Sequence, residues 1–351
     1  MTQSIGVIGA GAWGTAMAMS LARQGHHVEL WALEKDVVES INLRHENERF
    51  LPGFKAPENL KASSDIKAVA TDKNFLILAS PSLYLARTMQ GLLDVPNIKN
   101  GSTCIGVLTK GFIPSNKGPR LILETLEEVL PECYAKNLVY IAGPSHAEEV
   151  AIGKVTGLIA ASENPMNSIR FREVLKSRGL LVFSSLDVIG VQICAAAKNV
   201  VAIAFGCLDA IAKKSDVFGD NTESLLFAAG LNEIQTIGRA MGATHPETFT
   251  SLSGVGDLDV TCRSKFGRNQ RFGHDIIENS ILDRFKDIDD LIARISEIGY
   301  LPEGAIACKY VQEISEAQGI KLPICNGLYR ILNKELRPVE FIQQILDGIE
   351  I

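Results

Sequence analysis

The sequence lacks the features that would place it among metal-binding, nucleic-acid-binding or membrane proteins. Its six histidines and seven cysteines form no Cys-x-x-Cys pair and no His-rich stretch of the kind that holds zinc. The formal net charge of −6 gives no overall attraction to nucleic acids or anionic membranes. No apolar run approaches the roughly 18 residues of a membrane span. Met1–Ser4 carries no basic residue, and the apolar run Ile5–Ala10 fits a short strand rather than a signal-peptide core. We therefore expect no metal site, no nucleic-acid partner and no membrane span.

The cysteines are scattered along the chain and odd in number. The simplest interpretation is a reducing, cytoplasmic location. A small buried hydrophobic side chain is a better interpretation of each cysteine than a metal ligand or a nucleophile. The cysteines are Cys104, Cys133, Cys194, Cys207, Cys262, Cys308 and Cys325.

Length and composition indicate a globular protein of two domains. Hydrophobic residues make up 46% of the chain and charged residues 22%, which is ample material for a core. The 351 residues exceed the length at which a single core stops growing, about 250 to 300 residues.

Short β-rich runs alternate with helical or turn-rich stretches in the first half of the chain. This alternation is typical of a mostly parallel sheet covered by helices on both faces. A helix is expected over Thr15–Arg23, and strands are expected over Ser4–Ile8, His27–Trp31, Phe75–Ala79, Thr103–Leu108, Leu138–Ala142, Gly157–Ala161 and Leu180–Phe183.

From about Asp187 the pattern becomes helical, and no convincing strand follows. We predict an α/β fold in which a dinucleotide-binding domain, residues 1–186, precedes an all-helical substrate-binding and catalytic domain, residues 187–351. Helical spacing is found over Val188–Leu208, Asn221–Met241, Asp275–Glu278, Ile288–Ile298 and Ala305–Gln318.

The segment Gly9-Ala10-Gly11-Ala12-Trp13-Gly14 follows an expected strand and opens an expected helix. In this context Gly9 permits a tight turn, Gly11 lets the backbone approach a pyrophosphate, and Gly14 allows close helix–strand packing. The helix N-terminus adds N–H groups and a positive dipole. The motif predicts a Rossmann-type doubly wound sheet that binds a dinucleotide.

The end of the second expected strand does not decide between NAD and NADP. An acid there accepts the ribose 2′-OH of NAD, whereas a nearby Arg meets the 2′-phosphate of NADP. Here Trp31-Ala32-Leu33 occupies the strand end, Glu34 lies just beyond it, and Lys35 could equally serve a phosphate. The expected cofactor is NAD or NADP.

Six segments, in order along the chain, resemble the bacterial-type glycerol-3-phosphate dehydrogenases. The resemblance implies NAD(P)H-dependent, reversible reduction of dihydroxyacetone phosphate to sn-glycerol 3-phosphate, which feeds glycerophospholipid synthesis, and a homodimer. The segments are Gly9–Gly14, Asn47–Gly53, Thr109–Gly111, Gly143–Ala147, Ala195–Asn199 and Gly256–Asn269, and Pro302–Gly304 resembles a further cofactor contact.

The resemblance also implies a role for individual residues, with Lys198 as the catalytic proton donor and acceptor. The substrate-binding residues that it implies are Lys110, Gly143, Ser145, Lys198, Asp257, Gly267, Arg268 and Asn269. The cofactor-binding residues that it implies are Gly9, Gly11, Ala12, Trp13, Gly14, Leu33, Lys110, Ala147, Arg268, Leu301 and Glu303.

Elementary chemistry gives Lys198 a role of the same kind. It lies in the apolar run that begins near Asp187, between Ala197 and Val200. Burial lowers the pKa of a lysine, which makes it usable as a general acid or base near neutrality. Reduction of a carbonyl needs such a group, because the oxygen gains charge as hydride arrives. The alternative is a lysine whose charged end reaches solvent at a domain surface.

Asp257 and Thr261 are four residues apart, so on a helix they share one face and can jointly hold Lys198 or substrate hydroxyls. The alternative for Asp257 is an ordinary acid at a helix N-terminus. The pair Arg268-Asn269 falls in a polar stretch with one glycine, residues 263–271, which we expect to be a loop. A guanidinium there can bind a phosphate through two parallel hydrogen bonds.

Lys110 and Gly143–Ala147 each follow an expected strand, where ligands bind doubly wound sheets. Ser145 fits a helix N-cap equally well. Two positions depart from the family pattern: relatives commonly carry Glu at the position of Gln192, and many carry Ser at the position of Gly267. We expect altered local hydrogen bonding rather than lost activity.

Two other functions fit part of the pattern. A dehydrogenase of the same architecture could act on a hydroxy acid or sugar acid, but Arg268-Asn269 and Gly143–Ala147 argue against it. A sensor that binds NAD(P)H without chemistry has no need of a buried lysine.

Overall fold

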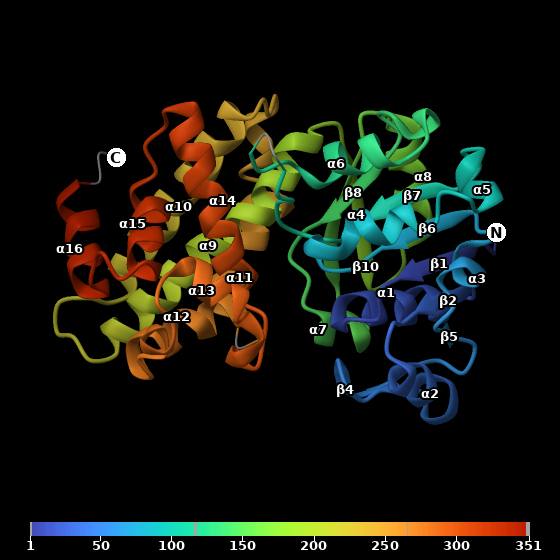
Figure 1. Ribbon diagram of the computed structural model, residues 1–351, viewed down its shortest axis with the longest axis horizontal. Coiled ribbons are helices and arrows are strands. Elements are labelled where there is room, and N and C mark those ends of the chain that lie inside the picture. The colour runs from blue at the N-terminus through green and yellow to red at the C-terminus, as the bar shows by residue number, and fades with distance from the viewer. Residues whose placement is uncertain (1, 116–117, 265, 349–351) are drawn as a thin grey trace. The chain divides into compact units, whose positions relative to one another are not determined.

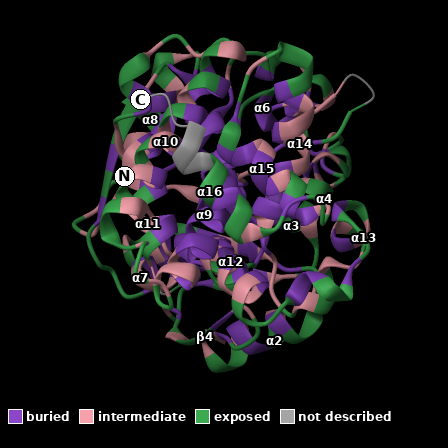
Figure 2. Ribbon diagram, turned by 90° about the vertical axis from the view of Figure 1, so that its left-hand side faces the viewer, coloured by how far each residue is buried: buried purple, intermediate pink, exposed green. Residues whose placement is uncertain are grey.

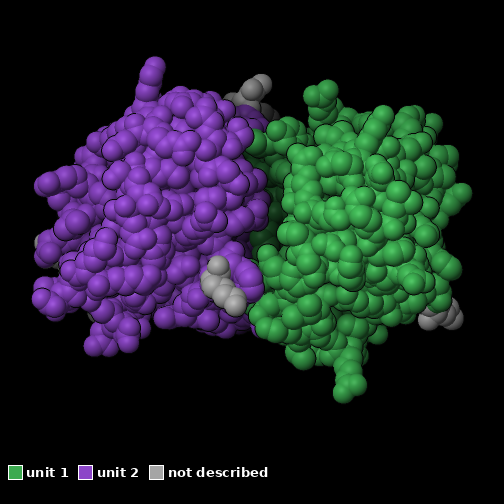
Figure 3. Space-filling model, turned by 90° about the horizontal axis from the view of Figure 1, so that it is seen from below, with its two compact units in different colours: residues 1–113, 121–188 green, residues 114–120, 189–351 purple. Residues whose placement is uncertain are grey.

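The computed structural model of the chain describes residues 2–115, 118–264 and 266–348. They belong to two compact units, which Figure 3 shows in different colours. Unit 1 comprises residues 1–113 and 121–188, and unit 2 comprises residues 114–120 and 189–351. The assignment of residues 114–120 to unit 2 is a feature that the sequence pattern does not predict.

Unit 1 is built on an eight-stranded sheet of mixed direction (Figure 1). Six neighbouring strands are parallel, and the antiparallel pairing of β8 with β9 reverses the last two. In spatial order the strands are β10 (Leu180–Ser185), β9 (Thr156–Ala161), β8 (Val139–Ala142), β7 (Cys104–Val107), β6 (Phe75–Leu78), β1 (Ser4–Ile8), β2 (His27–Trp31) and β5 (Lys61–Ser63).

Helices and a small hairpin accompany the sheet of unit 1. They are α1 (Ala12–Arg23), α2 (Lys35–Arg44), β3 (Glu46–Asn47), β4 (Leu51–Lys55), α3 (Ile66–Ala70), α4 (Ser82–Gln90), α5 (Pro96–Lys99), α6 (Ile122–Val129), η1 (Glu132–Tyr134), α7 (Ala147–Ala151) and α8 (Pro165–Leu175). Every residue of β6, β7 and β8 is buried, so both faces of the central sheet are covered.

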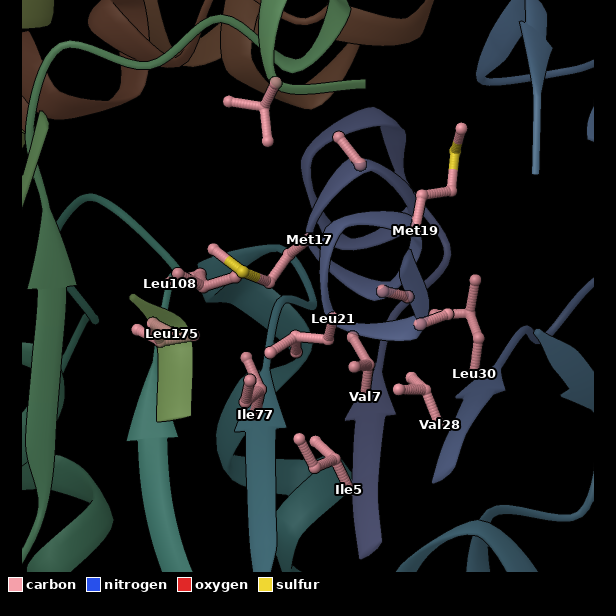
Figure 4. Packing of buried hydrophobic residues seen from close by; sticks show 14 of the residues in the cluster. Ile5, Val7, Met17, Met19, Leu21, Val28, Leu30, Ile77, Leu108 and Leu175 are labelled. Carbon is pink, nitrogen blue, oxygen red and sulfur yellow. The ribbon is translucent and has the colours of Figure 1, made fainter. Parts of the chain in front are cut away.

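The core of unit 1 forms where α1 packs on the sheet. Figure 4 shows Leu21 of α1 beside Val7 of β1 and Ile77 of β6, with Met17 one turn earlier on the same helix, and all four side chains are fully buried. Full burial of such a side chain contributes about 1.5 to 3 kcal/mol. This packing fixes α1 against the strand that precedes it. The predicted Rossmann-type sheet is confirmed.

Unit 2 is helical: the described residues after Ser185 contain no strand. Its α-helices are α9 (Val188–Ala212), α10 (Asp220–Ala240), α11 (Asp257–Arg263), α12 (Arg268–Glu278), α13 (Ile288–Ala293), α14 (Glu303–Gln318), α15 (Pro323–Leu332) and α16 (Pro338–Gly348). Its short helical segments are η2 (Pro246–Thr248), η3 (Leu252–Gly256), η4 (Ile281–Arg284) and η5 (Ile295–Ile298). The helical pattern of residues 288–298 thus divides into α13 and η5.

Helix α9 corrects the expectation that no apolar stretch of the chain approaches the length of a membrane span. Over 18 residues its mean hydropathy reaches 1.9, so by length and composition it is apolar enough to cross a membrane. The polar residues Gln192, Lys198 and Asn199 interrupt the run and hide this in a simple count. In the structure 94% of that window is buried within the protein (Figure 2). Helix α9 is therefore a core helix, against which α10, α12 and α14 pack.

Helices α9 and α12 approach each other closely because glycines face the contact. A Cβ atom on Gly206 of α9 would lie 2.1 Å from the Gln270 carbonyl oxygen. A Cβ atom on Gly273 of α12 would lie 2.3 Å from the Ile203 carbonyl oxygen. This contact places the first turn of α12 against the middle of α9, where Lys198 and Asn199 lie.

A buried acid, Glu233, joins α10 to α15. Its carboxylate accepts hydrogen bonds from the backbone N–H groups of Ile324 (2.6 Å) and Cys325 (2.9 Å), which lie in the first turn of α15. The two N–H groups would otherwise lack partners at the helix N-terminus. Burial raises the pKa of Glu233 to about 7, although both hydrogen bonds act in the opposite direction.

The raised pKa of Glu233 predicts a pH dependence of stability. Between its ordinary value of 4.5 and about 7, the folded protein binds the proton more tightly than the unfolded chain. The free energy of unfolding therefore falls as the pH rises through this window, by up to about 3 kcal/mol. We expect Glu233→Gln to flatten this slope, measured as the denaturant midpoint at about pH 5 and pH 8. The exposed control Glu247→Gln should keep it. An unchanged slope in Glu233→Gln would contradict the assignment.

Candidate active site

The glycine turn between β1 and α1 has the geometry that the motif predicts. Gly9 has φ +121°, and its N–H donates to the Trp31 carbonyl of β2 (3.2 Å). A Cβ atom on Gly14 would lie 2.0 Å from the Gly9 carbonyl oxygen, so only glycine fits there. Gly11 is the N-cap of α1 and has no side chain to cap the helix. The N–H groups of the first turn can therefore donate hydrogen bonds to a pyrophosphate. Ala12 and Trp13 begin the helix.

A buried asparagine that motif analysis left without a chemical role, Asn47, holds this turn in place. Its side-chain amide donates to the Ala10 carbonyl and to the Thr15 hydroxyl, both at 2.8 Å. Its carbonyl oxygen accepts from the Phe50 N–H at 3.0 Å. Asn47 thus cross-links the glycine turn to the β3–β4 hairpin. Its only signal in the sequence was its place in a family segment.

The end of β2 lies beside the glycine turn, because Ile8 and Trp31 pair in the parallel register. Leu33 follows the strand and is 74% exposed. Glu34 is the N-cap residue of α2, but its carboxylate caps no backbone N–H. The structure therefore leaves both side chains accessible to a ligand at this strand end, as the predicted cofactor role of Leu33 requires.

The other predicted residues of unit 1 follow β7 and β8, which run parallel to β1 and β2. Lys110 follows β7, and Gly143 follows β8 with φ +145°. A Cβ atom on Gly143 would lie 2.7 Å from the Gly157 carbonyl oxygen. All predicted site residues of unit 1 therefore gather at one end of the sheet, the carboxyl ends of its parallel strands.

Ser145 is not the N-cap that the alternative interpretation proposed. Its hydroxyl donates to the Gly143 carbonyl (2.9 Å), and the N-cap of α7 is His146. The Gly143 carbonyl is within reach of the Ser145 hydroxyl because it lies two residues back in the same tight turn. Ala147 begins α7 and is buried.

In unit 2, three residues from two helices meet around one ammonium group. Lys198 Nζ donates to the Asp257 carboxylate and, at 2.9 Å, to the Thr261 hydroxyl. Thr261 in turn donates to the Asp257 carbonyl at 2.6 Å. Lys198 is 5% exposed and Asp257 is 1% exposed, so both charges are almost completely withdrawn from water. The predicted shared face of Asp257 and Thr261 is confirmed, and it holds the lysine.

The local backbone explains how Asp257 reaches Lys198. The π-helical segment η3 runs directly into α11, which begins at Asp257. Within η3, a Cβ atom on Gly254 would lie 2.0 Å from the Phe249 carbonyl oxygen, so the tight path requires glycine. A buried ion pair of this kind is costly to desolvate and adds little net stability. Such pairs occur where a function requires the charge.

Cys262 lies in α11 next to Thr261, close enough to feel the ammonium of Lys198. Burial raises the pKa of the Cys262 thiol, although the Lys198 charge acts in the opposite direction. A thiol nucleophile needs a lowered pKa. Cys262 is therefore a buried neutral side chain.

Arg268 and Asn269 do not lie in a loop as expected; they are the first two residues of α12. The glycine and polar residues that indicated a loop instead form the start of a helix, with Gly267 as the N-cap. A Cβ atom on Gly267 would lie 2.9 Å from the Thr261 carbonyl oxygen, which explains why glycine stands there. The first turn of α12 provides N–H groups with a positive dipole, a setting that favours an anion.

Asn269 is buried and joins three helices. Its amide donates to the Asn199 side-chain oxygen of α9 (3.0 Å), and its own oxygen accepts from the Gly304 N–H of α14 (2.9 Å). A Cβ atom on Gly304 would lie 2.3 Å from the Asn199 carbonyl oxygen, so α14 begins in close contact with α9. Asn199, the neighbour of Lys198, was not among the predicted site residues.

Of the arginines near this helix start, Arg268 is exposed and has no hydrogen-bond or ion-pair partner among the described residues. Arg263 pairs with Asp259 at 3.0 Å. Arg271 lies over the Tyr300 ring, 4.5 Å from its centroid. The structure therefore favours Arg268 over its neighbours as the side chain that can turn to a phosphate.

The remaining predicted residues lie at or near the starts of helices in unit 2. Leu301 is half-buried, just before α14, and Glu303 is the first residue of that helix. Gln192 is buried on α9, six residues before Lys198. No group of three or more His, Cys, Asp or Glu side chains suited to a metal occurs in the part of the chain that the structure describes.

The chemistry of the two sets of residues differs. Unit 1 offers a glycine turn, a helix N-terminus and strand ends, which suit a dinucleotide. Unit 2 offers a buried lysine held by an acid, which suits proton transfer, and an arginine at a helix start, which suits a phosphate. A Rossmann-type unit followed by a helical unit with these groups defines a two-unit, nicotinamide-dependent dehydrogenase.

Comparison with known proteins identifies the family within that class. Residues 4–168 match the N-terminal domain, and residues 187–343 the C-terminal domain, of NAD-dependent glycerol-3-phosphate dehydrogenase. The glycerol-3-phosphate dehydrogenase [NAD(P)+] of Treponema denticola is 60% identical over 99% of both chains. That of Treponema pallidum is 55% identical over 98% of this chain and 99% of its own.

Solved structures agree with this result. The glycerol-3-phosphate dehydrogenase of Coxiella burnetii superimposes with a TM-score of 0.84 at 31% identity, covering 99% of each chain. The enzyme of Saccharomyces cerevisiae gives 0.79 at 25% identity, covering 98% of this chain and 99% of its own. The chain belongs to the NAD(P)-dependent glycerol-3-phosphate dehydrogenase family, as its motifs predicted.

Proposed function

We propose that the chain catalyses the reversible, NAD(P)H-dependent reduction of dihydroxyacetone phosphate to sn-glycerol 3-phosphate. The observation that carries this proposal is the buried Lys198–Asp257–Thr261 set in a chain of this family. Reduction of a ketone needs a hydride at carbon and a proton at oxygen. When bound, the reduced nicotinamide supplies the hydride to C2 of the substrate.

Lys198 is the proposed proton donor in this direction and the acceptor in reverse. As the C2 carbonyl oxygen gains charge, the ammonium transfers one proton to it and becomes a neutral amine. Asp257 orients the ammonium and balances its charge before transfer, and the Thr261 hydroxyl fixes its direction. The proton returns from solvent in the next cycle. Asp257 thus has two proposed roles: it binds the substrate, and it orients Lys198.

The substrate phosphate is proposed to bind at the start of α12. Arg268 supplies an exposed guanidinium that pairs with none of the residues the structure describes, and Gly267 leaves the first-turn N–H groups without a side-chain cap. Hydrogen bonds to Asn199 and Gly304 fix the orientation of the Asn269 side-chain amide, and the proposed contact with the substrate uses the amide in that orientation. Lys110, Gly143 and Ser145 complete the proposed substrate set.

The proposed cofactor set is Gly9, Gly11, Ala12, Trp13, Gly14, Leu33, Lys110, Ala147, Arg268, Leu301 and Glu303. The geometry of the glycine turn and of the β2 end supports its first members. We further propose a cytoplasmic location, supported by the absence of disulfides among the seven cysteines. A homodimer and a role in supplying glycerophospholipid synthesis are proposed from family membership.

The test is turnover by the purified full chain. With NADH or NADPH and dihydroxyacetone phosphate, we expect loss of nicotinamide absorbance and formation of glycerol 3-phosphate. Parallel kinetics with the two cofactors would set the preference. A chain that left dihydroxyacetone phosphate unchanged with both cofactors, but reduced a keto acid, would instead be a hydroxy-acid dehydrogenase. Tight cofactor binding without turnover on any ketone would indicate a sensor.

A further inference from the structure

A cluster of three side chains on α12 and the segment before α14 has no part in the function proposed above. The Tyr300 hydroxyl donates to the Asp275 carboxylate. The Arg271 guanidinium lies over the Tyr300 ring, 4.5 Å from its centroid, and Arg271 Nε is 3.9 Å from the Asp275 carboxylate. Tyr300 is half-buried and Asp275 is 16% exposed, so the hydroxyl–carboxylate bond is partly shielded from water.

The same segment has a second attachment to α12, four residues further on. The Gly304 N–H donates to the Asn269 side-chain oxygen at 2.9 Å, and Pro302 between the two attachments is buried. Residues 300–304 are therefore fastened at both ends to one helix. Between these points lie Leu301 and Glu303, two of the proposed cofactor residues.

The cluster lies on the same face of α12 as Arg268, the residue proposed to bind the substrate phosphate. Arg268, Arg271 and Asp275 follow one another at helical spacing and share a face of α12. Asn269 and Phe272 form the buried face of the same helix. Arg271 is engaged with the Tyr300 ring, while Arg268, one turn earlier, has no partner among the described residues. Of the two arginines on this face, Arg271 therefore has a structural contact and Arg268 remains available to a ligand.

We propose that Tyr300, with Asp275 and Arg271, is a positioning residue that fixes the segment 300–303 on α12 and so sets Leu301 and Glu303 for the cofactor. This proposal rests on the proposed function. Tyr300 is not among the proposed catalytic, substrate-binding or cofactor-binding residues and acts through the backbone of the residues that follow it. A charged acceptor makes its hydrogen bond stronger than a neutral one. Burial and the Asp275 carboxylate raise the pKa of Tyr300, so the hydroxyl stays a donor.

The test is Tyr300→Phe in the full-length protein, which removes the hydroxyl and keeps the ring over Arg271. We expect the KM and the Kd for NADH or NADPH to rise about five- to twentyfold, because the segment loses one fixed end. The value of kcat at saturating cofactor should stay within about twofold of the parent, since Lys198 is untouched. Cofactor affinity is measured by quenching of protein fluorescence.

Two further variants make the result specific. Asp275→Asn keeps an acceptor oxygen and should cost less affinity than Asp275→Leu, and Asp275→Leu should add little to Tyr300→Phe. The matched control is Tyr329→Phe on α15, whose hydroxyl bonds no other described residue, and it should change neither value. Cofactor affinity within twofold of the parent in Tyr300→Phe would overturn the proposal. So would an equal loss in Tyr329→Phe.

The outcome is separable from that of the proposed function. If the parent protein fails to reduce dihydroxyacetone phosphate with either cofactor, the proposed function fails, yet the Kd comparison still decides the role of Tyr300. If the parent is active and Tyr300→Phe binds cofactor normally, only the positioning role fails. A fall in thermal midpoint that matches the loss of affinity would show a general structural role and would also overturn the proposal.

Discussion

Replacing Lys198 with alanine is expected to lower kcat for reduction of dihydroxyacetone phosphate by about a thousandfold, the usual size of a general-acid contribution. Hydride can still reach C2, but the oxygen must take its proton from water in a site built around an ammonium. Cofactor affinity should stay within a few-fold of the parent, because no predicted cofactor residue is removed. Steady-state kinetics and a separate cofactor titration measure the two quantities.

The ion pair requires its own control, because Lys198→Ala leaves the Asp257 carboxylate buried without its cation. Such a change can destabilise a fold by about 3 to 5 kcal/mol. The double variant Lys198→Ala/Asp257→Asn removes both charges, so it should regain stability and stay inactive. An added primary alkylamine should partly restore turnover in the single variant.

Lys213 supplies the matched lysine, since it lies just beyond the C-terminal end of α9, its side chain is 56% exposed, and its Nζ is 3.4 Å from the Asp209 carboxylate. Lys213→Ala should keep parental turnover. Near-parental kcat in a folded Lys198→Ala variant would remove the lysine from the mechanism.

Seven of the eight strands of the main sheet could be predicted because each is a short apolar run, a local signal, and the fingerprint from Gly9 to Gly14 states which turn the chain must make. The edge strand β5, Lys61-Ala62-Ser63, has no such run and was not predicted. The reversal at β9 and β10 could not be predicted, because strand direction depends on pairing across the sheet rather than on the run itself. The short hairpin β3–β4 carries too few apolar residues to give a strand pattern.

The candidate site shows the same division. Asp257 and Thr261 could be paired from their spacing on one helix. The start of α12 was missed because Gly267 and its polar neighbours have the composition of a loop, while the contact that fixes them is with α9. Asn47, Asn199 and Tyr300 act through partners 20 or more residues away, and no local pattern reports such contacts.

The second large effect is expected for Arg268→Ala, which should lower kcat/KM for dihydroxyacetone phosphate by about a hundred- to a thousandfold. Two parallel charge-assisted hydrogen bonds to a phosphate are worth roughly 3 to 4 kcal/mol together, and each 1.4 kcal/mol is a factor of ten. Arg268→Lys keeps the charge but not the planar fork, so it should recover only part of the loss.

The decisive comparison for Arg268 uses dihydroxyacetone, which has no phosphate. At saturating cofactor, which removes any effect of Arg268 on cofactor affinity, the parent should prefer the phosphorylated substrate strongly. Arg268→Ala should lose most of that preference while its slow turnover of dihydroxyacetone stays the same. Arg263→Ala is the matched control, because Arg263 is engaged with Asp259 and the Phe205 ring and should keep the parental ratio. If Arg268→Ala slowed both substrates equally, the arginine would act on the cofactor or on the fold. The phosphate would then be bound without Arg268, by the N–H groups of α12, which carry no more than a partial charge, and by the other proposed substrate residues.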